Sequence, residues 1–275
     1  MQTVRELWEE VLPDLVVSIP FSLERCTKVV FRVGSHSHGT YISPEDDSGI
    51  DDVDLMVVCV PPPEFKLGLR TWEHAEFKHS KWDVVFYDWQ KWLIMVRKSN
   101  PNVVGTLWLE DEDIYIPNNG NANSIFDLMR NRRCLLSKQM YPAFVGYAKG
   151  QFYKMTHLAH QGYMGEKRKR LVEKYGYDVK NAAHMIRLLR MACEVFEYGR
   201  LQVKRTFDAE ELIEIKTGKW SLDQVIEESQ KLLTRAEGAL SHTTVREFPD
   251  DLFIQKMMVQ GYQENWEPLW WEGVV

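Results

Sequence analysis

The sequence predicts an α/β fold, with a small mixed sheet near the N-terminus and a mostly helical C-terminal lobe. Three short β-branched and aromatic runs, at 28–33, 53–60 and 82–88, are each bounded by glycine, proline or a change of periodicity. From about residue 124 the apolar residues recur at helical intervals instead. We therefore expect two domains, 1–120 and 121–275, with the helical one closing a cleft.

Composition restricts the class of protein. Hydrophobic residues make up 44% of the chain, enough for a packed core, and the formal net charge of -6 means that any nucleic-acid contact has to be local. The start is a charged amphipathic pattern without the apolar centre of a signal peptide, and no run of about 18 apolar residues occurs. The four cysteines lack the CxxC spacing of zinc sites, which indicates reduced core thiols. We expect a cytoplasmic protein with no membrane association.

Several helices can be placed from their end signals. The pattern at 89–99 changes to helical spacing and stops before an Asn-Pro-Asn turn, and that at 177–199 stops at Gly199. Further helical patterns cover 208–216 and 221–240. The aromatic, acidic end at 264–275 is either a docked arm or a partner-binding peptide. We favour the docked arm, because exposed tryptophans are uncommon.

Acidic residues open the second predicted strand. Asp52 and Asp54 alternate with apolar residues, so their carboxylates share one face, about 6–7 Å apart, a separation that two hard cations can bridge. Burying such anions costs several kcal/mol unless a cation compensates. Asp83 begins the third strand and can reach the same metals if the two strands are neighbours. We therefore predict a metal site formed by these three aspartates.

Other acids precede this strand and could compete as ligands. They are Asp46, Asp47 and Asp51. Since side chains alternate along a strand, Asp51 would point to the face opposite Asp52 and Asp54. We favour the two in-phase residues.

A glycine and a serine follow the first predicted strand. At Gly34 the backbone can approach an anion closely, and the Ser35 hydroxyl adds a hydrogen-bond donor. This pair predicts a phosphate-binding turn. His36 and His38 in the same loop could coordinate a transition metal, hydrogen-bond a phosphate, or serve only as polar loop residues.

Two basic groups stand out in an otherwise acidic chain. On the predicted helix at 177–199, one face carries Lys180, His184 and Arg187 at i, i+4 and i+7. We expect these to line the cleft and neutralise phosphates, the alternative being an ordinary solvated face. The second group could bind an RNA backbone in a salt-dependent way and comprises Lys167, Arg168, Lys169 and Arg170.

The order "GS…G…DDVDLM" resembles the polymerase-β-type nucleotidyltransferase superfamily. More narrowly, "GSHSHGT", "DDVDLMVV", "NPNVVGTLW" and "GEKRKRLVEKYGYDVKNAAHMIRLLRM" are similar to a bacterial and phage subfamily of RNA-repair-pathway polymerase-β-like nucleotidyltransferases. The resemblance extends from about residue 28 to 235. It implies a polymerase-β-like sheet with a helical lobe.

The resemblance also implies roles for individual residues. Gly34 and Ser35 would hold a nucleoside triphosphate, while Asp52 and Asp54 would bind both of two Mg²⁺ ions, or Mn²⁺ in their place. Asp83 would be the third ligand and the candidate base. The implied reaction moves a nucleoside monophosphate from an NTP to an acceptor hydroxyl and releases pyrophosphate.

The acceptor implied by the resemblance is an RNA end, such as that of a tRNA. Two alternatives stay open: a protein side-chain hydroxyl, as in the nucleotidyltransferases of toxin–antitoxin pairs, or a catalytically inactive nucleotide- or RNA-binding module. The sequence leaves the nucleobase and the oligomeric state open.

Overall fold

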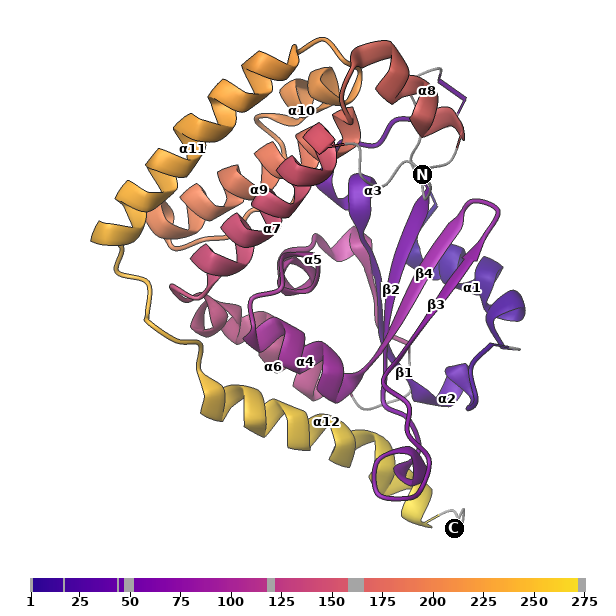
Figure 1. The fold of residues 1–275 in the computed structure, drawn as a ribbon. Helices are drawn as coiled ribbons and strands as arrows, with labels where there is room; N and C mark the ends of the chain where they lie inside the picture. Colours follow the sequence, from indigo (N-terminus) through magenta and orange to yellow (C-terminus); the bar gives the residue numbers. More distant parts are fainter. Residues whose placement is uncertain are drawn as a thin grey trace.

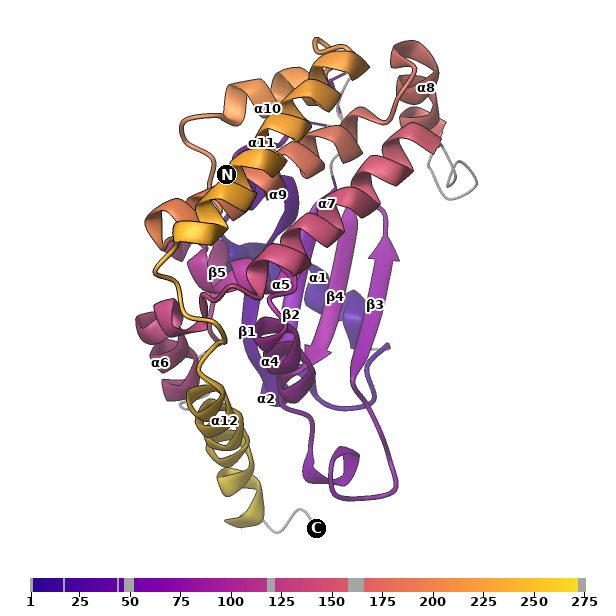
Figure 2. The same ribbon diagram turned by 60° about the vertical axis from the view of Figure 1, so that its left-hand side comes forward.

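The computed structural model describes residues 2–16, 18–43, 45–46, 52–117, 122–157 and 166–271, without the side chains of 157, 167 and 267–271. A β-sheet runs through the molecule with helices on both of its faces (Figure 1). The short helices near the N-terminus cover one face. The larger helical assembly, formed by the second half of the chain, covers the other (Figures 1 and 2).

The described residues form a five-stranded mixed sheet in the order β3-β4-β2-β1-β5. Only β2 and β4 are parallel; the other neighbours are antiparallel. The predicted strands correspond to β1, β2 and β4 within one residue, so the mixed α/β class is confirmed. The bounds are β1 Thr27–Arg32, β2 Val53–Cys59, β3 His74–His79, β4 Trp82–Asp88 and β5 Ile114–Tyr115.

The sequence did not reveal β3 and β5, which form the two edges of the sheet. β3 is mostly exposed and carries charged side chains, a common property of edge strands that avoid pairing with other chains. β5 is only two residues long. Neither strand contains the buried apolar run that marks an interior strand.

Helices α4, α9, α10 and α11 agree with the predicted patterns. The chain leaves α9 at Gly199, whose φ of 60° is the left-handed conformation that glycine adopts without strain. The helices are α1 Val4–Leu15, α2 Leu23–Cys26, α3 Gly34–His38, α4 Trp89–Arg97, α5 Pro101–Val104, α6 Asn123–Asn131, α7 Met140–His157, α8 Glu166–Tyr175, α9 Val179–Tyr198, α10 Ala209–Lys216, α11 Leu222–His242 and α12 Asp251–Trp271.

Strand alternation divides the apolar core in two. Leu55 and Val57 of β2 pack with α1 on one face, in a cluster that also contains Trp8. Met56 and Val58 face the other way and join the cluster built around α9. Asp54 belongs by its alternation to this second face, so it points toward the helical half of the chain.

The last helix returns to the N-terminal sheet. In α12, the Glu264 carboxylate pairs with the buried Lys28 ammonium of β1, and the Trp266 indole donates to the Pro61 carbonyl oxygen over 2.9 Å. The predicted docked arm is therefore confirmed up to Trp266. The side chains beyond it lie outside the described residues. The division into domains 1–120 and 121–275 stays a prediction.

No helix among the described residues is both long and apolar enough to cross a bilayer. The cysteines Cys26, Cys59 and Cys193 are buried and Cys134 is partly so, and all four are free. They pack as small apolar side chains, as expected from their spacing.

A buried arginine connects α9, the start of α10 and α3. Arg205 is fully buried, and its guanidinium donates to both carboxylate oxygens of Glu194 on α9 and to both of Asp208, the residue before α10. Its backbone N–H donates to the His38 carbonyl oxygen of α3 over 3.0 Å. This network sets the position of the α3 loop relative to α9.

Replacing Arg205 by methionine would leave the buried Glu194 carboxylate without its cation and Asp208 with Arg190 alone. We expect Arg205→Met to lower the free energy of unfolding by about 3–5 kcal/mol. Urea unfolding followed by circular dichroism measures this. Arg97→Met is the matched control, because Arg97 forms a comparable bidentate pair with Asp251 at the surface, where the expected loss is below about 1 kcal/mol. Equal losses in the two variants would contradict a structural role for the buried network.

Candidate functional site

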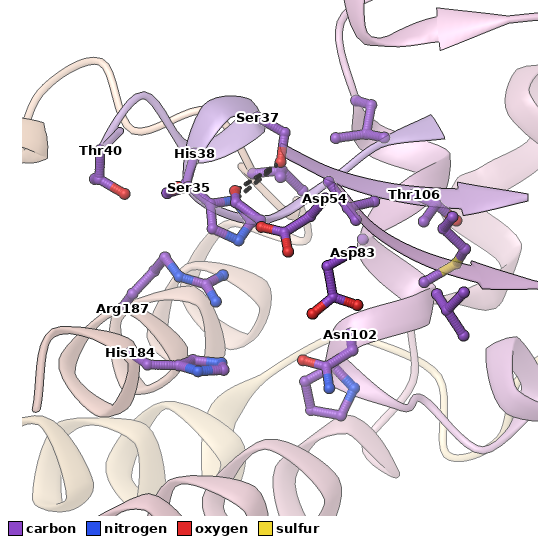
Figure 3. Close-up of a pocket in the computed structure, with 18 of the residues that line it drawn as sticks. Ser35, Ser37, His38, Thr40, Asp54, Asp83, Asn102, Thr106, His184 and Arg187 are labelled. Atoms are coloured by element: carbon purple, nitrogen blue, oxygen red, sulfur yellow. Dashed lines mark hydrogen bonds between the residues drawn. The ribbon is translucent and has the colours of Figure 1, made fainter. Parts of the chain in front are cut away.

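Two carboxylates lie side by side where β2 and β4 run parallel. Asp54 is the direct register partner of Asp83. Both line a cavity of about 520 Å³ between the sheet and the helical lobe (Figure 3). Asp52 is not among the lining residues; its side chain is 41% exposed and lies at the rim, 3.6 Å from the Lys78 ammonium. The structure therefore brings two of the three predicted acids together and leaves the third beside them.

Gly34 allows the Asp54 carboxylate to approach the backbone. Its φ of 71° is left-handed, and a Cβ atom at this position would lie 2.0 Å from Asp54 Oδ2. No other residue type fits here without displacing the carboxylate. The predicted glycine is thus required by two independent constraints.

The next residue has an unsatisfied hydroxyl. Ser35 lines the cavity, and its Oγ atom is buried without a hydrogen-bond partner among the described residues. Since buried polar atoms are nearly always paired, an orphan hydroxyl in a cavity is suited to bind a ligand. This fits the predicted phosphate-binding role of Ser35.

The opposite wall of the cavity is cationic. Helix α9 contributes Lys180, His184 and Arg187, as the i, i+4, i+7 spacing predicted. Figure 3 shows Arg187 and His184 facing Asp54 and Asp83 across the cavity. The ordinary solvated-face alternative does not hold for Arg187, which is 8% exposed.

Arg187 is a buried cation without an anionic partner in the described part of the chain. Its guanidinium donates a hydrogen bond to the Met191 sulfur at 3.4 Å, a weak acceptor. Burial, assisted by the nearby Arg205 cation, lowers the pKa of Arg187 to about 9. An anion bound in the cavity would compensate the positive charge of Arg187.

Two histidines in the cavity are held neutral. Burial, followed by the charge of Arg187, lowers the pKa of both His184 and His38 well below the ordinary value. His184 Nε2 is buried and unpaired within the described residues. His36, by contrast, stacks on Tyr41 with ring centroids 3.6 Å apart. His36 and His38, the two histidines of the H-x-H sequence, thus have different surroundings.

Sequence reasoning did not identify several lining residues. Lys216 of α10 reaches the cavity and donates to the Thr40 carbonyl oxygen over 2.7 Å. Asn102 lines the cavity and donates to the Tyr147 hydroxyl over 2.8 Å. Asn102 belongs to a motif that supported the family resemblance, so it could have been found. Lys216 has no such local signal, since the fold alone brings α10 to the site.

The basic cluster on α8 has partners of its own. Arg168 pairs with the buried Asp178 carboxylate that caps α9, which is a structural contact. Lys169 pairs with Glu166 at the surface, and Arg170 is exposed. The side chain of Lys167 lies outside the described residues. RNA binding by this cluster stays a prediction.

Two of the predicted acids are candidate ligands for a divalent metal. Asp54 and Asp83 offer the hard oxygen donors that Mg²⁺ prefers, held in register by the sheet. However, no group of three or more metal-ligating side chains is assembled within the described residues. Lys78 lies beside two of the acids, with its ammonium 2.7 Å from Asp83 and 3.6 Å from Asp52. The donor type of Asp54 and Asp83 therefore fits Mg²⁺, and the two residues are the candidate ligands.

The other predicted competitors can be placed only in part. Asp46 is exposed and absent from the cavity lining, whereas Asp47 and Asp51 lie outside the described residues.

Gly34→Ala tests the close approach of the carboxylate. We expect it to lower the free energy of unfolding by clearly more than Gly39→Ala, which has the same φ of 71° but only one ordinary contact, at 3.7 Å, for an added Cβ. Backbone strain alone costs about 1–2 kcal/mol, and this is the whole cost expected in the control. Chemical denaturation of both variants measures the difference. Equal losses would mean that Asp54 can move away freely.

Comparison with known proteins identifies the family of this chain. No curated protein matches the sequence. Among solved structures, a nucleotidyltransferase-like protein from Exiguobacterium sibiricum 255-15 is 15% identical, with 98% of this chain and 77% of that chain covered, at a TM-score of 0.26. A TM-score this low supports no functional inference. The model of the RNA repair pathway DNA polymerase beta family matches residues 20–253, so the chain belongs to this family, with the mixed sheet and helical lobe of a nucleotidyltransferase.

Proposed function

We propose that the protein is a metal-dependent nucleotidyltransferase that moves a nucleoside monophosphate from an NTP to an acceptor hydroxyl. One observation supports this above all: a single cavity places paired carboxylates opposite a buried, anion-deficient arginine (Figure 3). Its volume of about 520 Å³ is within the range of small-ligand sites. A triphosphate could extend between the two walls.

The residues divide into two functional groups. Asp54 and Asp83, joined by Asp52, would hold Mg²⁺ ions, which supply positive charge to the phosphates and acidify the attacking hydroxyl. On the other wall, Arg187 and Lys180 would bind phosphate oxygens by charge-assisted hydrogen bonds.

In the proposed reaction, residues of this chain take up the proton and offset the charge. The acceptor oxygen forms a bond to the α-phosphorus while the bond from that phosphorus to the bridging oxygen breaks, and pyrophosphate leaves. Asp83 takes the proton of the acceptor hydroxyl. The Ser35 hydroxyl donates to a phosphate oxygen, which satisfies its buried Oγ. Arg187 neutralises charge that develops on the leaving group.

The acceptor we favour is an RNA end, because the family whose model matches this chain is named for an RNA repair pathway. A protein hydroxyl is the second candidate acceptor. A labelling assay separates them: the purified protein is offered each α-³²P-NTP with Mg²⁺ and either tRNA, other RNA or cell protein. Label on protein alone would favour the second acceptor.

Asp54→Asn and Asp83→Asn are expected to reduce this labelling at least about 100-fold, because each removes a charge used at the reacting phosphate. Near-native circular dichroism spectra would show that the fold survives. Asp223→Asn on the exposed face of α11 is the matched control and should label like the wild type. Full activity in either site variant would refute the assignment.

Arg187→Met is expected to separate binding from stability. It should weaken binding of inorganic triphosphate about 10- to 100-fold, the worth of a hydrogen bond to a charged group. The free energy of unfolding should stay equal or rise, because methionine replaces a buried cation that has no carboxylate partner. Calorimetric titration and urea unfolding measure the two effects. Arg235→Met, which breaks a surface pair with Glu197, is the binding control. Unchanged triphosphate affinity would place Arg187 outside the binding site.

A further inference from the structure

A lysine lies among the candidate metal ligands. Lys78 of β3 is the direct register partner of Asp83 in the antiparallel β3–β4 pair. Its ammonium donates to Asp83 Oδ2 over 2.7 Å and lies 3.6 Å from Asp52 Oδ2. One cation thus bridges two of the three acids.

This lysine offsets an unfavourable arrangement. Neighbouring carboxylates repel one another, and a cation between them lowers that repulsion. The ammonium therefore takes the electrostatic role that a divalent ion would have at the same carboxylates. It also occupies an oxygen of Asp83 that a metal would need.

Lys78 can leave without rearranging the fold. Its side chain is 67% exposed and extends from the edge strand β3, so it can swing into solvent while the backbone stays in place. Exposed ion pairs of this kind contribute little free energy. A divalent ion that carries twice the charge can therefore displace it.

We infer that Lys78 is a displaceable counter-ion, which stabilises Asp52 and Asp83 in the metal-free protein and competes with the divalent metal for them. This inference rests on the proposed function, since it requires that these carboxylates take a metal. It implies that the site binds free metal weakly and is filled most readily by a metal that arrives with the nucleotide phosphates.

The same hairpin offers a matched control. Lys81 is 47% exposed, and its ammonium pairs with Glu10 at 2.7 Å and lies over the Trp82 ring. Removing it changes the net charge equally but leaves the carboxylate cluster untouched.

The test is a Mn²⁺ titration of the chelator-treated full chain, with free Mn²⁺ measured by electron paramagnetic resonance and no nucleotide present. We expect Lys78→Met to bind Mn²⁺ about three- to tenfold more tightly than the wild type, because one competing charge is gone. Lys81→Met should stay within about twofold of the wild type. Saturating Mn²⁺ should also raise the Tm of Lys78→Met by more than that of Lys81→Met, each relative to the same variant in metal-free buffer, because tighter binding stabilises the folded state more.

The outcomes separate the two proposals. Equal tightening in both lysine variants, or no change in either, would overturn the role of Lys78 and leave the proposed function intact. If none of the three proteins binds Mn²⁺, metal-dependent transfer by these carboxylates is overturned as well. Tighter binding confined to Lys78→Met, with the Tm effect, supports the counter-ion.

Discussion

The structure depends on one electrostatic constraint: parallel pairing of β2 and β4 sets Asp54 directly beside Asp83. Two like charges opposite each other in a sheet are unfavourable, and this pair lies on the face of the sheet that lines the cavity, with the Asp83 side chain 39% exposed. The surroundings compensate in different ways. Gly34 gives one carboxylate room, and Lys78 offsets the charge of the other.

The opposite wall has the complementary imbalance. Arg187 and Arg205 are both buried, but their partners differ. Arg205 bonds to two carboxylates and has its charge satisfied within the fold, whereas the Arg187 guanidinium donates to the Met191 thioether. A buried cation without a carboxylate partner among the described residues, such as Arg187, does not stabilise the fold. Its burial is explained by a role in a binding site. The cavity therefore has one acidic and one basic wall.

This polarity agrees with the chemistry of a nucleotidyltransferase family. The metal–nucleotide complex of the proposed function would present cations at one side and phosphate oxygens at another, which would complement a cavity with two charged walls. The neutral histidines that line the cavity fit as well. Because burial and Arg187 keep the pKa values of His38 and His184 low, they add hydrogen-bonding atoms without adding charge.

Local sequence patterns predicted much of the fold and part of the site. Alternation identified the interior strands and the in-phase aspartates, and helical spacing grouped Lys180, His184 and Arg187, because both periodicities are properties of the backbone. The edge strand β3 was missed since it lacks a buried apolar run, and Lys78 was missed with it. Lys216 was missed because α10 reaches the cavity only through the packing of the helical lobe.

The sequence by itself therefore determined which residues of β2 and of α9 point the same way. Only the tertiary structure decided which faces meet. It paired Asp54 with Asp83, placed Lys78 between acids distant in the chain, and gave Arg205 its carboxylates while leaving Arg187 with a sulfur. The physical reason is that hydrophobic burial and strand pairing between distant segments select these contacts, and no local window of residues encodes them.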